Sequence, residues 1–131
     1  MLKKRISDNA EEFFDPIRKK WVPATKEEEV RQHFIQFLLT VKNIPASHIS
    51  IERVITVNGM TKRYDVVVFD NEGKPWMVVE CKAPHIELSQ SVMEQAGRYN
   101  KTLKAPIIGI TNGKENIFFQ IDFDSEVITL L

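Results

Sequence analysis

Two stretches of the chain repeat apolar residues every three or four positions, the spacing that predicts amphipathic helices. The first stretch begins after Thr25 and Glu28, which match the T-x-x-E capping box of a helix N-terminus. It ends at KNIPAS, where Pro45 is a stop signal. One buried stripe is expected from this spacing, formed by Val30, Phe34, Phe37, Leu38 and Val41.

The second helix is expected from about Ser91 to Lys104, with Ser91 and Glu94 as another capping box. Its apolar face is expected to consist of Leu88, Val92, Ala96, Tyr99 and Leu103. Gln95 falls on the same face, and a buried amide there requires hydrogen-bond partners. This glutamine is therefore either a core residue tied to backbone or a polar group that faces a site.

Strand-like runs with dense or alternating apolar residues occupy much of the remaining chain. Three lie between the two helices, namely ISIERVITVNG, RYDVVVFD and PWMVVECK. APIIGITNG and NIFFQIDF follow the second helix, and VITLL is a candidate last strand. The order helix, three strands, helix, two strands predicts an α/β domain around a mixed sheet, which starts as a meander and then adds a crossover.

The length and composition of the chain suit one domain. Of its 131 residues, 43% are hydrophobic and 27% are charged, which are ordinary values for a globular protein. Residues 1–24 are polar with weak periodicity and predict a short helix or an arm, ahead of a domain at residues 25–131. The formal net charge is zero, so composition gives no argument for a nucleic-acid partner.

Features that would indicate a membrane, a secretory route or a nucleotide are missing from the sequence. No apolar run approaches the roughly 18 residues that span a membrane, and the N-terminus lacks a signal peptide. Cys81 is the single cysteine, which excludes an internal disulfide and a cysteine-based zinc cluster. There is no Walker-type GK[ST], so no ATP site is expected. We therefore expect a cytoplasmic protein with no membrane partner.

The run PWMVVECK is unusual because charged residues follow directly on a buried pattern. Side chains alternate between the faces of a strand, so Glu80 and Lys82 share one face and Cys81 points to the other. If Phe69 lies opposite Trp76 across the NEGK turn, the numbers of paired residues sum to 145.

That register places Asp65 opposite Glu80, with Lys82 on the same face. A register with a sum of 147 pairs Asp65 with Lys82 and also keeps the three together, whereas a one-residue slip separates them. Two adjacent carboxylates without zinc-type ligands suit a hard cation such as Mg²⁺, and a lysine beside them can orient a water. This is the chemistry of phosphodiester hydrolysis. The alternative is structural: Asp65 starts a strand beside Arg63, and Glu80 and Lys82 form an ion pair.

A superfamily pattern joins these residues: Asp65, the ECK triplet at 80–82, and a Q-x-x-x-Y pair formed by Gln95 and Tyr99. The pattern resembles the PD-(D/E)XK nuclease superfamily, with Tyr64 in place of the proline. Four segments are more closely similar to the N-terminal nuclease domain of type I restriction enzyme R subunits. They are KEEEVRQHFIQFLL, KRYDVVVFDNEGKPWMVVECKAP, EQAGRYN and IIGITNG, and their order and spacing agree.

The resemblance implies a restriction-endonuclease-like α/β core with a metal-dependent active site on its central strands. Asp65 and Glu80 would bind Mg²⁺, which Mn²⁺ could replace, and the carbonyl of Cys81 would be a further ligand. Lys82 would position or activate the attacking water.

The two helices would complete this site. By the resemblance, Gln95 counts among the catalytic residues, and Gln95 and Tyr99 would support the site and the nearby DNA strand. A glutamate from the first helix often completes such sites, and Glu27 or Glu28 occupies that place. Judged from the residues alone, Glu27 either reaches inward from the edge of the helix or is a first-turn acid favoured by the helix dipole.

The function that the resemblance implies is that of a Mg²⁺-dependent DNA endonuclease domain. Its partners would be DNA and separate motor or specificity subunits of a restriction system, because R subunits carry an ATP motor after this domain. The alternative is a non-catalytic, nuclease-like module that binds DNA or protein, and the neutral net charge favours it modestly. A third hypothesis, a related nuclease acting on branched DNA or RNA, would share the same site.

Overall fold

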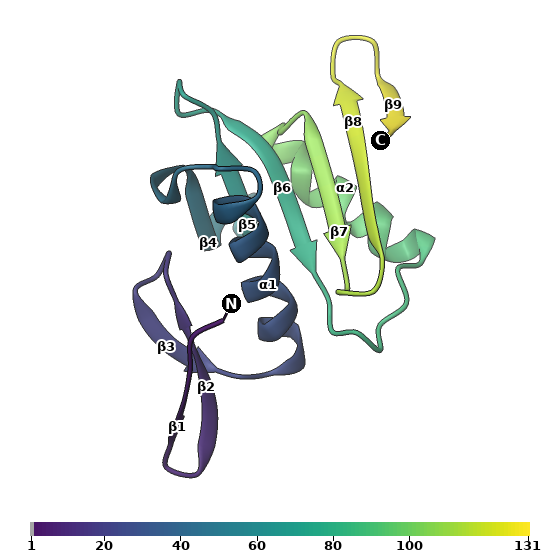
Figure 1. Cartoon of the computed structure of the whole chain (residues 1–131). Helices are drawn as coiled ribbons and strands as arrows, with labels where there is room; N and C mark the ends of the chain where they lie inside the picture. The colour runs from purple at the N-terminus through teal and green to yellow at the C-terminus, as the bar shows by residue number, and fades with distance from the viewer. Residues whose placement is uncertain (1) are drawn as a thin grey trace.

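A six-stranded mixed sheet forms the centre of the protein, in a computed structural model that describes residues 2–131 (Figure 1). The strands lie in the order β4-β5-β6-β7-β8-β9. Their bounds are Ile49–Val57 (β4), Met60–Phe69 (β5), Pro75–Cys81 (β6), Ile107–Thr111 (β7), Asn116–Asp122 (β8) and Val127–Leu130 (β9). β6 and β7 are parallel and the other neighbours are antiparallel, so the expected mixed α/β architecture is confirmed.

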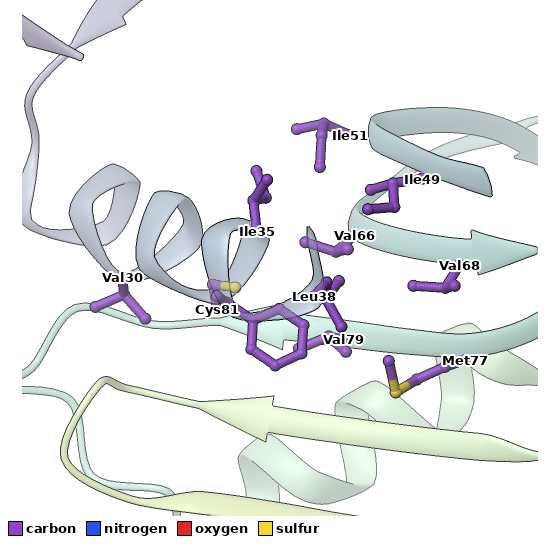
Figure 2. Packing of buried hydrophobic residues seen from close by; sticks show 11 residues of the cluster. Val30, Ile35, Leu38, Ile49, Ile51, Val66, Val68, Met77, Val79 and Cys81 are labelled. Atoms are coloured by element: carbon purple, nitrogen blue, oxygen red, sulfur yellow. The ribbon is translucent and has the colours of Figure 1, made fainter. Parts of the chain in front are cut away.

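Two helices cover opposite faces of this sheet, α1 (Lys26–Thr40) and α2 (Gln90–Leu103). The alternation of β5 shows the two faces: Val66 and Val68 pack in the core under α1, whereas Val67 packs in the core under α2. Figure 2 shows the α1-side core, in which aliphatic residues of the helix meet β4, β5 and β6. α2 is the crossover that allows β6 and β7 to run parallel.

Residues 4–23 form a separate three-stranded antiparallel sheet, which corrects the expectation of a short helix or an arm. Its strands are β1 (Lys4–Ser7), β2 (Ala10–Asp15) and β3 (Lys20–Pro23). Asp8 and Asn9 have positive φ values of 51° and 64°, the conformation of a two-residue type I′ hairpin turn. Phe13 and Val22 are the buried apolar residues of this sheet. With so few of them, its short strands show no clear alternation of apolar and polar residues in the sequence. The expected element order therefore lacked these three strands.

The register of the β5–β6 hairpin near its charged end is the one predicted first. Val66 pairs with Val79 and Val67 pairs with Val78, so the paired numbers sum to 145. The expected pairing of Phe69 with Trp76 is wrong, because the register shifts between Val68 and Phe69 and Phe69 pairs with Pro75. The shift lies at the turn end of the hairpin and leaves the opposite end unaffected.

A local break interrupts the ladder between β4 and β5 at Glu52 and Asp65. Glu52 has a φ of 53°, a left-handed conformation that is rare inside a strand. The ladder continues on both sides of the break, where Ile51 pairs with Val66 and Arg53 pairs with Tyr64. Tyr64 packs in the same core as Val67, although strict alternation would place residues three positions apart on opposite faces of the sheet. The break thus frees two carboxylates from the regular pattern at the edge of α1.

Helix α1 buries a different stripe from the one expected. Thr25 is its N-cap, as predicted, and accepts a hydrogen bond from the Glu28 N–H at 3.0 Å. Phe37 and Val41 are 41% and 62% exposed, so their assignment to the buried stripe is wrong. Arg31, Gln32 and Ile35 are buried instead. Gln32 contacts Asp15 of the N-terminal sheet, Arg31 contacts Glu52 and Asp65, and Ile35 packs in the core under α1. A short 3-10 helix (Ala46–His48) then leads into β4.

The N-cap of helix α2 lies two residues earlier than predicted. Ser89 is the N-cap and its Oγ accepts a hydrogen bond from the Val92 N–H, so the assignment of Ser91 and Glu94 as a capping box is wrong. Lys104 ends the helix in the left-handed region at φ 54°. No helix within residues 2–131 is long and apolar enough to cross a membrane.

Candidate active site

The predicted site residues meet where β5 and β6 approach α2 and the start of α1. A small cavity of about 120 Å³ lies against α2 at the end of β6. It is lined by Glu80, Lys82, Val92, Gln95, Ala96 and Tyr99. The structure therefore brings Glu80, Lys82 and the Q-x-x-x-Y pair to one cavity, with Asp65 next to it on β5.

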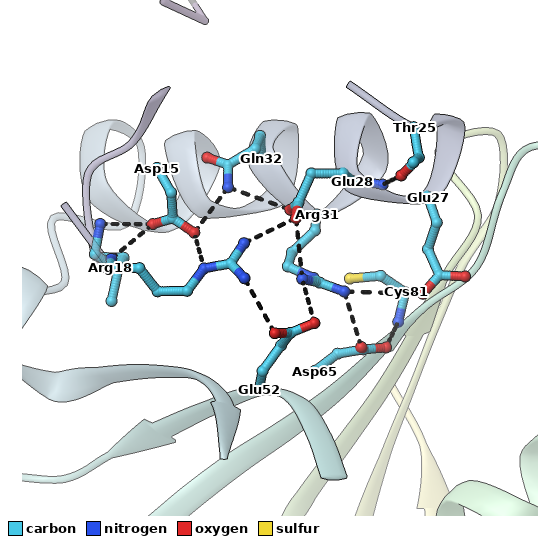
Figure 3. Close-up of polar contacts among 11 residues, drawn as sticks. Asp15, Arg18, Thr25, Glu27, Glu28, Arg31, Gln32, Glu52, Asp65 and Cys81 are labelled. Atoms are coloured by element: carbon cyan, nitrogen blue, oxygen red, sulfur yellow. Dashed lines mark hydrogen bonds and ion pairs between the residues drawn. The ribbon is translucent and has the colours of Figure 1, made fainter. Parts of the chain in front are cut away.

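Asp65 is fixed through both oxygens of its carboxylate (Figure 3). Its Oδ2 accepts the backbone N–H of Cys81 at 2.8 Å, which ties β5 to the end of β6. Its Oδ1 accepts Nη2 of Arg31, from α1, at 3.2 Å. The side chain therefore has a defined position even though its residue lies in the break of the ladder.

Glu80 is the most perturbed carboxyl group of the site. Burial, followed by the neighbouring charge of Asp65, raises its pKa from 4.5 to about 8. Its Oε1 is buried and has no hydrogen-bond partner among residues 2–131. Buried polar atoms are nearly always partnered, so an orphaned carboxyl oxygen beside another carboxylate marks a candidate ligand-binding position.

Lys82 continues the direction of β6 beyond its last residue. Its N–H donates to the carbonyl of Thr111 on β7 at 2.8 Å, which holds the backbone of the strand end. The side chain lines the same cavity as Glu80. Its positive charge favours the ionised forms of Glu80 and Glu27 and partly offsets their raised pKa values.

Gln95 and Tyr99 are joined to each other and to the sheet. Gln95 Nε2 donates to the Tyr99 hydroxyl at 3.1 Å, so the polar group on the apolar face of α2 does have a partner. The buried Tyr64 hydroxyl donates to the backbone carbonyl of Tyr99, and the two rings meet edge to face at 6.2 Å. Tyr64, the residue before Asp65, thus anchors α2 against the strand that carries Asp65.

The first-helix glutamate that lies nearer the site is Glu27. Burial, followed by the charge of Asp65, raises the pKa of Glu27. Its Oε1 lies 3.8 Å from Nη2 of Arg31, the nitrogen that also contacts Asp65 at 3.2 Å. The Glu28 carboxylate points to the other side and accepts hydrogen bonds from Arg18, Arg31 and Gln32. Between the two alternatives that the sequence left open, the geometry favours Glu27 as the acid that faces Asp65.

Cys81 has its side chain on the opposite face, as strand alternation predicted. The thiol is fully buried in the α1-side core (Figure 2). Burial, with the nearby Asp65 charge, raises the pKa of this thiol well above its ordinary value. Only the backbone of Cys81 is therefore available to the site.

A partly buried ion network beside Asp65 is the part of the site that the sequence did not predict. It includes Asp15, Arg18, Glu28, Arg31, Gln32 and Glu52, from the N-terminal sheet, α1 and β4 (Figure 3). One feature of the sequence indicated this network. Glu28, Arg31 and Gln32 are spaced i, i+3, i+4, so they share a face of the helix.

The carboxylate oxygens of Asp65 and Glu80 suit a hard cation. Mg²⁺ keeps several waters and commonly binds through one or two carboxylates together with substrate phosphates. Two neighbouring carboxylates, one with an orphaned buried oxygen, meet that need. No group of three or more His, Cys, Asp or Glu side chains in the described part of the chain is arranged to hold a metal ion, so a cage made of protein alone is not formed.

The family match assigns this α/β domain to a family named after the N-terminal part of a restriction enzyme subunit. The chain belongs to the family described as type I restriction enzyme R protein N terminus (HSDR_N), whose model matches residues 26–131. No curated protein matches the chain.

The chain is also similar to a solved structure, described as the fragment structure of a putative HsdR subunit of a type I restriction enzyme from Vibrio vulnificus YJ016. The TM-score is 0.58 and the sequence identity is 22%. The match covers 82% of this chain and 23% of that chain, so this chain spans about a quarter of its length. At this identity the likeness shows a shared fold.

Proposed function

We propose that this domain is a Mg²⁺-dependent endodeoxyribonuclease of the PD-(D/E)XK type. The observation that carries the proposal is the pair of neighbouring carboxyl groups of Asp65 and Glu80, one of them with a buried oxygen that lacks a partner among the described residues. Lys82 beside them supplies the positive charge that hydrolysis of a phosphodiester needs. The family, type I restriction enzyme R protein N terminus, supports DNA as the substrate.

Each residue of the proposed mechanism has a defined task. Asp65 and Glu80 would hold the metal ion, with the Cys81 carbonyl as a further ligand. When bound, Mg²⁺ would neutralise phosphate charge and lower the pKa of a coordinated water. The ammonium group of Lys82 would donate a hydrogen bond to the attacking water or to a phosphate oxygen, while one P–O bond forms to that water and another breaks.

Gln95 and Tyr99 would act on the DNA strand. Their hydrogen bond at 3.1 Å orients the amide and the phenol along the wall of the cavity that also contains Glu80 and Lys82. Both groups can donate hydrogen bonds to phosphate or sugar oxygens, contacts that position a strand without reading its sequence. We propose that sequence choice and translocation come from separate motor or specificity subunits.

A non-catalytic, nuclease-like module is the second candidate. The observation that favours it is that both oxygens of Asp65 already accept hydrogen bonds, from Arg31 and from the Cys81 N–H. In such a module the polar cluster would only hold the sheet and α1 together, and the domain would bind DNA or protein without cutting.

Plasmid nicking in Mg²⁺ tests the proposal. We expect the wild type to nick supercoiled DNA, and Glu80→Ala and Lys82→Ala each to lower the rate at least about 100-fold. Glu87→Ala, which removes an exposed carboxylate, is the matched control and should cut like the wild type. Equal rates for wild type, Glu80→Ala and Lys82→Ala would overturn the proposal. Salt-dependent DNA binding without cleavage would support the module instead.

A further inference from the structure

A continuous line of ion pairs leads from the N-terminal sheet to the carboxylate of Asp65 (Figure 3). It begins at Asp15, the fully buried last residue of β2. The Asp15 carboxylate accepts the backbone N–H groups of Ile17 and Arg18 at 2.8 and 2.9 Å, and it also accepts the Arg18 guanidinium. The turn after β2 is therefore built around Asp15, and it directs the Arg18 side chain towards α1.

Arg18 is the second step of the line. Its Nη2 donates to Glu28 on α1 at 2.8 Å, and its Nη1 donates to Glu52 on β4 at 3.1 Å. One planar guanidinium thus joins three elements through three carboxylates, an arrangement that the five donors of arginine permit and a lysine cannot reproduce. Gln32 reinforces the step, since its Nε2 lies 3.0 Å from Asp15 and 3.3 Å from Glu28.

Arg31 is the third step. Its Nη1 lies 3.3 Å from both Glu28 and Glu52, the same two carboxylates that Arg18 holds, and its Nη2 reaches Asp65 at 3.2 Å. Arg31 is 5% exposed, so its contacts with Glu28 and Asp65 are little weakened by solvent, whereas Glu52 is partly exposed. Glu28 and Glu52 therefore form a shared layer between the two arginines, and the position of Arg31 depends on where Arg18 holds that layer.

We propose that Arg18 is a positioning residue of the nuclease centre, which acts through Glu28, Glu52 and Arg31 to fix the carboxylate of Asp65. The inference rests on the proposed function. It makes the N-terminal sheet a working part of the site, although the family model begins only at residue 26. Asp65 and Glu52 lie where the β4–β5 ladder is broken, so side-chain contacts have to supply the order that backbone pairing does not.

The backbone of Cys81 provides a direct reporter of this positioning. Its amide hydrogen is bonded to the side chain of Asp65 on β5, at Oδ2. The next amide along the chain, that of Lys82, is bonded to the Thr111 carbonyl. A displaced Asp65 carboxylate should therefore speed hydrogen exchange at Cys81 and not at Lys82, whereas a general loosening of the strand end should speed both.

Arg18→Lys is the variant of choice, because Arg18→Met would leave buried carboxylates uncompensated and endanger folding. We expect Arg18→Lys to speed exchange at Cys81 about tenfold relative to Lys82. In Mg²⁺ it should lower kcat about tenfold with KM for DNA within about twofold, since orientation and not substrate binding is lost. Arg31→Lys should give the same pattern, and the double variant should lose little more than either alone.

Arg5→Met is the matched control, since Arg5 makes an ion pair with Glu12 on the exposed side of the same sheet. It should leave the exchange ratio and kcat unchanged. The inference is overturned if Arg18→Lys keeps the wild-type exchange ratio, or if exchange at Cys81 and Lys82 rises equally in step with a lower free energy of unfolding. If wild-type protein does not cut DNA, the proposed function fails, and the exchange ratio alone then decides this inference.

Discussion

The carboxyl group of Glu80 lies buried next to that of Asp65, on the neighbouring strand of one hairpin. Two like charges at short range in a poorly hydrated place disfavour each other, and the guanidinium of Arg31 already compensates that of Asp65. Burial, followed by the charge of Asp65, raises the pKa of Glu80 to about 8. A protein without metal should keep a proton on Glu80 at neutral pH, and a bound cation should remove it.

The first prediction concerns stability in the absence of metal. The pKa of Glu80 is about 8 in the folded protein and near 4.5 when unfolded. Between these values the unfolded chain releases a proton that the folded protein retains, so the free energy of unfolding falls as pH rises, by up to about 1.4 kcal/mol per pH unit. Glu80→Gln cannot ionise, and its stability relative to the wild type should therefore increase from about pH 5 to about pH 8.

Denaturant unfolding in a chelator across this pH range provides the measurement. Glu87→Gln, an exposed carboxylate, should follow the wild-type pH profile. Parallel profiles for Glu80→Gln and the wild type would show that Glu80 ionises normally.

The second prediction links metal binding to proton release. Because a ligand carboxylate has to be ionised, Mn²⁺ or Mg²⁺ should displace the proton of Glu80 at about pH 6.5. Calorimetric titrations in two buffers with different ionisation enthalpies should give close to one proton released per metal ion. Glu80→Gln should release none. Tight binding without any buffer dependence would mean that the metal binds elsewhere.

The third prediction uses two glycines as a matched pair. A Cβ at Gly109 of β7 would lie 2.4 Å from the Phe118 ring, so Gly109→Ala should destabilise the sheet by about 1–3 kcal/mol through overpacking. A methyl group added at Gly97 of α2 would meet nothing within 4 Å, so Gly97→Ala should stabilise by about 0.5–1 kcal/mol. Urea denaturation measures both. A stabilising Gly109→Ala would contradict the close packing of β7 against Phe118.

The fourth prediction concerns the link between β5 and α2. Tyr64→Phe removes the hydroxyl that donates to the Tyr99 carbonyl and should lower the free energy of unfolding by about 1 kcal/mol. Tyr99→Phe removes only the half-buried contact with Gln95 and should have a smaller effect. An equal or larger loss in Tyr99→Phe would mean that the buried bond contributes little.

The hairpin register near Asp65 could be predicted because a period of two and a Gly-containing turn restrict pairing to a few choices. The exact pairs at the turn could not, since the shift at Phe69 depends on local backbone geometry. The N-terminal sheet was missed because its strands are short. One of its buried residues, Asp15, is also polar: it accepts a hydrogen bond in the turn and pairs with Arg18, so it adds nothing to an apolar pattern. The Asp8-Asn9 pair, which forms the hairpin turn, was the feature of the sequence that indicated this sheet.

The hydrogen-bond partners of Asp65 could not be predicted from the sequence, for a different reason. Arg31 reaches Asp65 across a separation of 34 residues, and Arg18 reaches Glu52 across the same separation. Helical spacing places Arg31 on a face but does not say which strand lies against that face. The break at Glu52 had one sign in the sequence, the apolar neighbours Val54 and Ile55, which interrupt the alternation of β4.

Whether Asp65 and Glu80 together bind a metal ion can be decided by a crystal structure of the wild-type protein with Mn²⁺, read by its anomalous signal. We predict one Mn²⁺ peak bridging the carboxylates of Asp65 and Glu80, with oxygen ligands at about 2.1 Å and loss of the peak in Glu80→Gln. A structure with no peak there at saturating Mn²⁺, and with Asp65 still held only by Arg31 and the Cys81 N–H, would contradict a metal-dependent nuclease centre at this position.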